Sequence, residues 1–285
     1  MKYEGELKIV GGAAAFALIP VFAILGKDLS VYCLLLGRLI FASLILYILV
    51  KNKKEIFNIS IKKILFLTFW SLLMLGAMIT YFLSIHISGM AVSAAILGIQ
   101  PLFIVILSGI LLKEKISLLT WFSCLICVGG IVLVSGIDGF SSLDSSAGIL
   151  LAIASALFLS FNFLLKKMYL NDISGIDIVF YQCIFQIPFL IPFIFIEPGT
   201  LNFDGVMASF FLGLVCTVIS YVLIYDGIEK VKAQQIGILQ SIENVLPVFI
   251  GVLFYSEQMN LLSGMGVFLI IGSTILITVF TKQTD

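Results

Sequence analysis

The chain has 285 residues, of which 61% are hydrophobic and 11% are charged. Ordinary soluble domains contain about 45–50% apolar and about 25% charged residues, so this composition excludes a soluble globular protein. The 16 lysines and arginines balance the 16 aspartates and glutamates, so the net charge favours neither nucleic acid nor an acidic partner.

Long apolar segments, bounded by charges, glycine, proline or asparagine, predict an all-α integral membrane protein with ten transmembrane helices. A spanning helix needs about 20 apolar residues, which leaves only short connections. The first segment has a charged start like a signal peptide, but it lacks a small-x-small cleavage site, so we expect it to remain as a helix. In chain order the predicted segments are 8–26, 31–50, 64–86, 91–112, 118–136, 147–166, 176–196, 206–226, 233–254 and 261–281.

The positions of the lysines predict the orientation of these helices. With a cytoplasmic N-terminus, fourteen of the cations fall in cytoplasmic segments, Lys27 falls outside and Arg38 falls within a span. This one-sided distribution is the positive-inside bias of membrane proteins. We therefore expect a multi-pass protein of the cytoplasmic (inner) membrane with both termini in the cytoplasm.

The sequence also contains an internal repeat. A shift of 143 residues places segment 96–118 on segment 239–261, and Gln100 then falls on Glu243. We predict two repeats of five helices, residues 1–138 and 139–285. Because five is odd, the second repeat enters the membrane from the opposite side, and carriers built this way bind their substrate near the midplane between the repeats.

The same shift places Glu114 on Glu257, and a shift of 140 residues places Tyr81 on Tyr221. These stretches resemble the EamA-type carriers of the drug/metabolite transporter superfamily, which have ten helices in two five-helix repeats. The resembling sequences are GRLIF around Arg38, the Thr217-to-Tyr221 pattern, IQPLFIVILSGILLKEKIS and its counterpart IENVLPVFIGVLFYSEQMN. The family usually has Glu-Pro in the second repeat, whereas here Asn244 follows Glu243 and the proline is Pro247. The resemblance implies a binding site between helices 1, 3, 4, 6, 8 and 9.

Glu243 is the most informative candidate residue. It lies ten residues beyond Ala233, which is about 15 Å along a helix and near the middle of a hydrocarbon core about 30 Å thick. A carboxylate there must be paired, protonated or in contact with water. It therefore either couples protons, binds a substrate amine, or is a protonated group bonded to a neighbouring helix. Pro247 leaves the Glu243 carbonyl without its helical donor, so we expect a broken helix.

Arg38 is the second candidate, about 10 Å deep in the predicted second helix. It is either a clamp for an anionic group of the substrate, a charge partner of Glu243, or a structural cation that holds carbonyls or lipid phosphate. The family resemblance favours the structural interpretation, because EamA-type carriers often have arginine here whatever their substrate.

Further polar and aromatic residues lie inside the apolar segments, where they tend to face the interior of the bundle. We expect a substrate site formed by Tyr81, Gln100, Asn162, Tyr221 and Glu243. His86 is expected at the interface and not as a metal ligand. Glu114, beside Lys113 and Lys115, is expected to form a solvated ion pair.

No catalytic motif and no phosphate-binding loop occurs, so the sequence predicts neither an enzyme nor an ATP-driven pump, and no cofactor or metal. The leading hypothesis is a secondary transporter that exports amino-acid-like or drug-like metabolites by alternating access. Its expected partners are the small-molecule substrate, membrane lipid and protons, and it acts as a monomer or homodimer. The alternatives are uptake or exchange of a nucleotide-like metabolite, such as S-adenosylmethionine or a nucleotide sugar, and a lipid scramblase.

Overall fold

The computed structural model describes residues 3–26, 28–51, 60–88, 93, 96–135, 146–196, 199–246 and 261–280. Within these ranges all regular elements are helical. They are α1 (Glu4–Phe16), α2 (Ile19–Leu25), α3 (Val31–Val50), α4 (Ile61–Ser88), α6 (Gln100–Leu111), α7 (Leu118–Ser135), α8 (Ser146–Tyr169), α9 (Gly175–Ile196), α10 (Phe203–Gly213), the π-helix η3 (Leu214–Ile219), α11 (Ser220–Ile228), α12 (Ala233–Gln240), the 3₁₀ helix η4 (Ser241–Asn244) and α14 (Leu261–Phe280).

Five segments among the described residues are long and apolar enough to cross a membrane. They are Val31–Val50, Ile61–Ser84, Ala147–Tyr169, Gly175–Phe195 and Phe203–Ile228. Three shorter apolar helices, Gln100–Leu111, Leu118–Leu133 and Gly264–Ile277, lie within other predicted spans. The all-helical membrane fold is thus observed, while the count of ten spans and their orientation stay predictions.

Four predicted segments are not continuous α-helices in the described residues. Segment 206–226 is interrupted by the π-helix η3 without a proline, and each of the other three contains a proline. In segment 8–26, α1 ends at Phe16 and α2 begins at Ile19, because Pro20 has no N–H to donate to the Phe16 carbonyl. In segment 91–112, α6 begins only at Gln100, directly before Pro101. In segment 233–254, the α-helix ends at Gln240 and a 3₁₀ turn follows. Pro247 and Glu257 lie outside the described residues, as does the side chain of His86.

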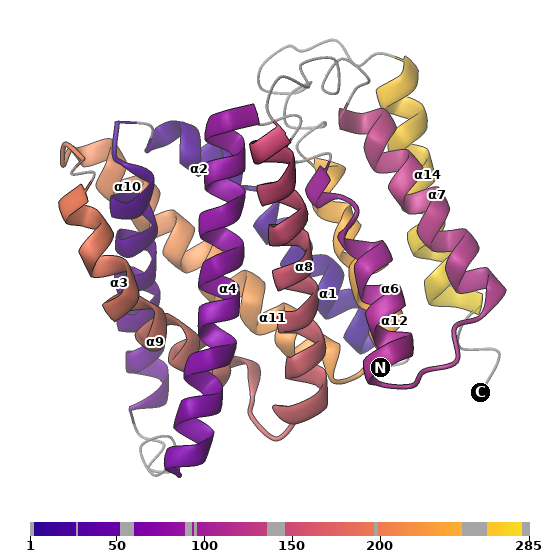
Figure 1. Ribbon diagram of the computed structural model, residues 1–285, viewed down its shortest axis with the longest axis horizontal. Helices are drawn as coiled ribbons and strands as arrows, with labels where there is room; N and C mark the ends of the chain where they lie inside the picture. Colours follow the sequence, from indigo (N-terminus) through magenta and orange to yellow (C-terminus); the bar gives the residue numbers. More distant parts are fainter. Residues whose placement is uncertain are drawn as a thin grey trace.

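The helices lie side by side in a bundle (Figure 1). Helices α3, α9 and α10 form one end of its long axis, α7 and α14 form the other, and α1, α4, α8 and α11 lie between them. The most extensive contacts join α4 to α8, α7 to α14, α1 to α11, and α3 to both α9 and α10. Segments far apart in the sequence therefore meet throughout the bundle.

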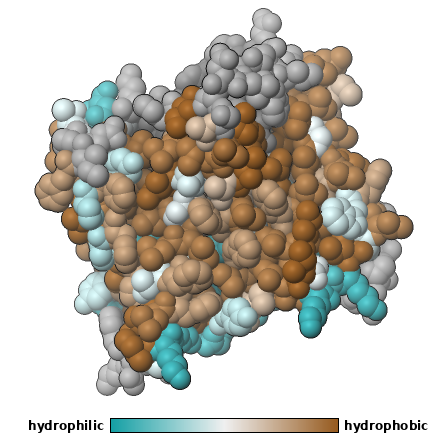
Figure 2. Space-filling view, viewed as in Figure 1, coloured by the Kyte–Doolittle hydropathy of each residue, from teal (hydrophilic) through white to brown (hydrophobic). Residues whose placement is uncertain are grey.

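The surface of the bundle is apolar over most of the face in Figure 2, and the most hydrophilic residues gather along its lower edge. Large apolar side chains are almost fully exposed on several helices; Leu118, Phe195 and Phe268 have exposed fractions of 88%, 82% and 77%. So large an exposed apolar area is unusual for a soluble monomer and is expected where lipid covers the protein.

Candidate functional site

Glu243 lies in η4, where the regular α-helix has ended. Its neighbour Asn244 closes this turn, because Asn244 Nδ2 donates to the Ser241 carbonyl at 3.3 Å. The Glu243 side chain is half-buried, and it forms no hydrogen bond or ion pair with another described residue. Side chains three residues apart are eclipsed in a 3₁₀ helix, which puts Gln240, the residue before η4, on the side of Glu243. The expected break in this helix is present within the described residues.

Two buried amides near Glu243 each have one atom without a hydrogen-bond partner among the described residues. Gln240 is 5% exposed and its Oε1 has no hydrogen-bond donor, and Gln100 is 6% exposed and its Nε2 has no acceptor. Gln100 and Pro101 begin α6, which packs directly on α12. A Cβ added to Gly237, one turn before Gln240, would lie 2.6 Å from the Pro101 Cα, so only glycine permits this approach. The close packing brings Gln100 to the segment that carries Gln240 and Glu243.

Aromatic side chains of α1, α4 and α11 lie near the same segment. The buried Tyr221 ring meets Phe16 edge-on at 5.4 Å and stacks on Tyr225 at 5.5 Å. Its hydroxyl donates to the weak acceptor Met74 Sδ at 3.6 Å. Tyr81 is half-buried on α4. Both Tyr81 and Tyr221 lie within electrostatic range of the Glu243 carboxyl.

Arg38 is buried against the π-helix η3. Its Nε donates to Thr217 Oγ1 at 2.5 Å and its Nη2 lies 3.5 Å from the Cys216 carbonyl oxygen. Its guanidinium carbon lies 6.0 Å from the centre of the Tyr221 ring. Thr217 in turn donates to the Leu212 carbonyl, five residues back, as a π-helix allows. Arg38 forms no ion pair with Glu243, so of the roles predicted for it the charge partnership is not formed.

Asn162 belongs to a different cluster, between α4, α8, α9 and α11. Its Nδ2 donates to the Trp70 carbonyl at 3.0 Å, and Trp70 Nε1 donates back to the Asn162 carbonyl at 2.8 Å. The Tyr225 hydroxyl lies 3.1 Å from Asn162 Oδ1 and 3.0 Å from Gln182 Oε1. A hydroxyl has one proton, so Tyr225 donates to only one of these amides. When it donates to Asn162 Oδ1, the Gln182 amide is turned so that its N–H₂ donates to the Tyr225 hydroxyl oxygen. Both amide atoms of Asn162 are thus engaged, unlike those around Glu243.

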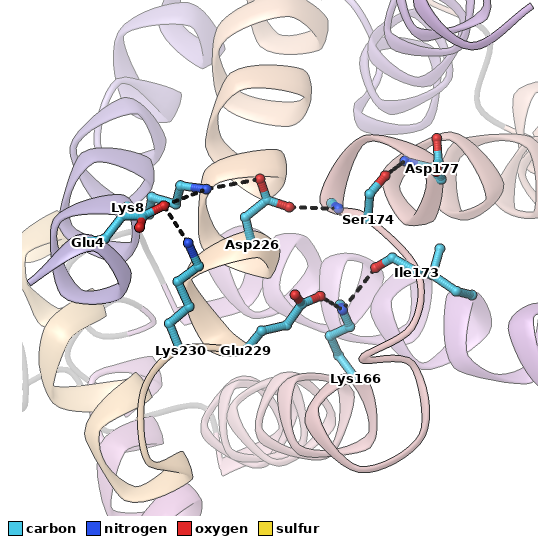
Figure 3. A network of polar contacts seen from close by, with 10 residues as sticks. Glu4, Lys8, Lys166, Ile173, Ser174, Asp177, Asp226, Glu229 and Lys230 are labelled. Atoms are coloured by element: carbon cyan, nitrogen blue, oxygen red, sulfur yellow. Dashed lines mark hydrogen bonds and ion pairs between the residues drawn. The ribbon is translucent and has the colours of Figure 1, made fainter. Parts of the chain in front are cut away.

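Charged side chains gather at one end of the bundle, which we call the basic end, defined by Lys8, Lys63, Lys166, Lys167 and Lys230. Figure 3 shows Lys8, Lys166 and Lys230 with their acidic partners. The Asp226 carboxylate on α11 accepts the Gly175 N–H that begins α9, at 2.7 Å, and lies 3.4 Å from Lys8 Nζ. A Cβ on Gly175 would lie 2.4 Å from Asp226 Oδ1, so this contact requires glycine. Lys230 and Glu4 form a further ion pair, between the end of α11 and α1.

Two lysines at the end of α8, the buried Lys166 and the half-buried Lys167, bind carbonyl groups. Lys166 is 0% exposed; its Nζ donates to the carbonyls of Leu170 (2.7 Å) and Ile173 (3.2 Å) and to Glu229 Oε1 (2.6 Å). Lys167 Nζ donates to the carbonyls of Ile228 and Val231 at the end of α11. Cations at helix C-termini satisfy carbonyls that have no helical donor.

The interpretation of Glu114 as a solvated ion pair is wrong. Its Oε1 accepts the Ala233 N–H at 3.1 Å and its Oε2 lies 3.4 Å from the Gln234 nitrogen, so it caps the N-terminus of α12. Lys113, with φ of 54°, turns the chain after α6 in the left-handed region and so directs Glu114 to α12. The sequence signal was the repeated Glu at 114 and 257, but nothing in it identified the partner.

The chain is similar to known transporter sequences and to solved structures. The sequence profile of the EamA-like transporter family matches residues 4–136 and again residues 146–279. The uncharacterized transporter YxxF of Bacillus subtilis (strain 168) is 26% identical over 195 residues, 66% of this chain, and the uncharacterized transporter YetK of the same strain is 27% identical over 205 residues, 68% of this chain. Each match spans 61% of the relative's length. A solved crystal structure with 14% identity has a TM-score of 0.85 over 99% of this chain and 98% of its own, which shows a shared fold.

Proposed function

Because the chain belongs to the EamA-like transporter family, in the drug/metabolite transporter superfamily, we propose that it is a secondary carrier of small organic metabolites in the cytoplasmic membrane. The members of this family are transporters and not enzymes, and the chain is a multi-pass membrane protein. We propose export of an amino-acid-like or drug-like solute, with Glu243, Tyr81, Gln100 and Tyr221 at the binding site. Asn162 and Arg38 support the site from the helices behind it.

The observation that carries this proposal is the half-buried Glu243 in a non-α segment, beside two unpartnered buried amides. A charge in the middle of a membrane helix costs about 3 kcal/mol, and a buried polar group without a partner costs about 1–3 kcal/mol. A purely structural cluster gains nothing from these costs. A site that binds and releases a polar solute requires such groups to be free between cycles.

The helix contacts support alternating access by two related halves. Under the shift of 143 residues, α3 corresponds to α9, α4 to α10–α11, α7 to α14, and α8 to α1–α2. Helix α4 packs on α8 as α11 packs on α1, and α4 packs on α9 as α10 packs on α3. Helices α3 and α9 contact each other, and so do α7 and α14. Contacts that recur with the halves exchanged are what a carrier needs to adopt two related states.

Proton coupling at Glu243 is part of this proposal, since a carboxyl that alternates between water and the bundle interior can carry a proton. Of the titratable and charged side chains on the described helices packed around it, Tyr81 and Tyr221 lie within its electrostatic range, and Arg38 lies against Tyr221. The lysines of the basic end bind carbonyls and carboxylates there. Glu243 is therefore the group whose protonation we expect to respond to a pH gradient.

The test is transport by the purified protein in liposomes. Labelled amino acids, nucleosides and S-adenosylmethionine are offered with and without a pH gradient, with empty liposomes and the Glu243→Gln variant as controls. We expect at least one solute to accumulate and the proton dependence to disappear in the variant. Flipping of a fluorescent lipid without transport of any solute would reject the carrier function in favour of a scramblase. Transport limited to S-adenosylmethionine would select the nucleotide-like alternative.

A further inference from the structure

We propose that the carrier recognises its solute through a cationic amine, and that the site offers no cation to a carboxylate. The site is the group formed by Glu243, Gln240 and Gln100 with the Tyr81, Tyr221 and Phe16 rings. The inference rests on the proposed carrier function and narrows its substrates to organic amines without a free carboxylate.

The charges near Glu243 favour a cationic solute. Glu243 forms no ion pair with a described residue. The buried cation nearest to this region is Arg38, which is 2% exposed and directs Nε and Nη2 to Thr217 and the Cys216 carbonyl. A solute carboxylate would therefore lie beside a second negative charge with no partner. A solute ammonium would instead complete an ion pair with Glu243, which is where charge complementarity sets specificity.

The hydrogen-bond acceptors near Glu243 favour an ammonium group. An ammonium group has up to three N–H donors and no acceptor, so it needs several oxygens on one side. Gln240 Oε1 is buried without a donor among the described residues, and Gln240, directly before η4, lies three residues before Glu243 and is therefore on the same side of the turn. The carboxylate and this amide oxygen together supply acceptors on a single face. A bound amine satisfies both, which no described side chain does.

Gln100, on the α6 side of the same segment, offers the solute a further polar group. Its Nε2 is buried without an acceptor. An amide presents a donor or an acceptor according to how it is turned, so Gln100 accepts a third amine N–H or donates to a hydroxyl or carbonyl of the solute. It occupies the position in the first repeat that Glu243 occupies in the second, and a neutral amide there leaves one negative charge for one amine.

The aromatic rings of the site favour an apolar group on the amine. The Tyr221 and Phe16 rings pack edge-on at 5.4 Å, and Tyr81 on α4 lies within electrostatic range of Glu243. Aromatic faces attract cations within about 6 Å of the ring centre and also cover apolar groups. An aromatic or aliphatic amine fits this combination. A nucleotide or sugar phosphate would find at this site, among the described residues, only Arg38, which is bonded to Thr217 and the Cys216 carbonyl.

The experiment compares three probes that share a phenyl ring and differ in charge. Phenethylamine is cationic, phenylalanine is zwitterionic and 3-phenylpropionate is anionic. Uptake of each into liposomes containing the full chain is measured at one pH. We expect phenethylamine to be transported at least about tenfold faster than the other two, which corresponds to about 1.4 kcal/mol. We expect Glu243→Gln to remove this preference and Asp172→Asn, a carboxylate in the exposed loop after α8, to keep it.

Each outcome decides the inference separately from the carrier function. Equal or faster transport of phenylalanine or 3-phenylpropionate overturns the amine preference. Phenethylamine transport that is unchanged in Glu243→Gln also overturns it, as does an absence of phenethylamine transport in liposomes that carry another solute of the screen above. In these three cases the chain remains a carrier. To separate binding from folding, the unfolding temperature of Glu243→Gln must be no lower than that of the unmodified chain, and its gel-filtration profile must be the same. Gln240→Leu must reduce phenethylamine transport while phenylalanine transport stays at its low level.

Discussion

At the basic end of the bundle Lys166 has three oxygen partners and Glu114 caps two backbone N–H groups. Around Glu243, by contrast, Gln100 Nε2 and Gln240 Oε1 have none, and the carboxylate faces no cation among the described residues. Both clusters join helices of the two predicted repeats. Lys166 and Glu114 have their hydrogen bonds within the protein and stabilise the packing of helices. The cluster around Glu243 has polar atoms without a partner among the described residues, as the proposed ligand site requires.

The largest expected effect is at the basic end. Lys166→Met removes a fully buried cation, and with it one hydrogen bond to each of the Leu170 carbonyl, the Ile173 carbonyl and Glu229 Oε1. We expect the free energy of unfolding to fall by about 3 kcal/mol. Titration with sodium dodecyl sulfate, followed by tryptophan fluorescence, measures it. The control is Lys62→Met, which removes an exposed lysine of α4. A loss no greater than in the control would mean that this cluster does not stabilise the fold.

The second prediction is that a substitution at Glu243, unlike one at Lys166, does not lower the free energy of unfolding. Glu243→Gln replaces an unpaired carboxyl by a neutral amide of the same shape, so burial costs less. We expect the free energy of unfolding to stay constant or to rise by about 1–2 kcal/mol while the proton dependence of transport is lost. The same detergent titration measures stability. A clear loss of stability would show that Glu243 has a structural partner, and the contrast between the clusters would disappear.

The third prediction concerns the cap on α12. Glu114→Gln keeps an oxygen for the Ala233 and Gln234 N–H groups but removes the charge that favours a helix N-terminus. We expect a loss of about 0.5–1 kcal/mol and faster hydrogen–deuterium exchange in the first turn of α12. Lys115→Gln, which changes the exposed neighbouring residue, is the control. Unchanged exchange at 233–235 would contradict the cap.

The smallest effect is expected at the exposed rim of the basic end. Lys63 Nζ lies 2.7 Å from Asp172 Oδ2, and this hydrogen bond lowers the pKa of the Asp172 carboxyl below its usual value. A carboxyl with a lowered pKa in the folded state stabilises the protein above the unfolded-state pKa and loses this contribution as the pH falls below about 4. The pair is exposed, so we expect less than about 1 kcal/mol. Asp172→Asn should flatten the dependence of the unfolding temperature on pH in this range, and an unchanged slope would contradict it.

Particular residues show how far sequence reasoning reaches. Glu243 was identified by its depth in an apolar segment, and the break around it by Pro247, because both follow from local chemistry. The partners of Glu114 and Arg38 were not predicted, since Ala233 and Thr217 lie far along the chain. Asn162 was grouped with Glu243 because both are polar residues in apolar helices. Its carbonyl and amide are in fact used by Trp70.

The sequence by itself determined that the chain is an apolar helical membrane protein with a repeat and a lone acidic residue deep in a helix. Composition, apolar length and proline positions act locally, so they are readable without a structure. Only the tertiary structure decided which polar groups are satisfied. The side chains of Lys166 and Glu114 have partners, whereas Gln100 Nε2 and Gln240 Oε1 have none among the described residues. That distinction depends on which helices pack together, because a hydrogen bond forms only when its two atoms come within about 3 Å.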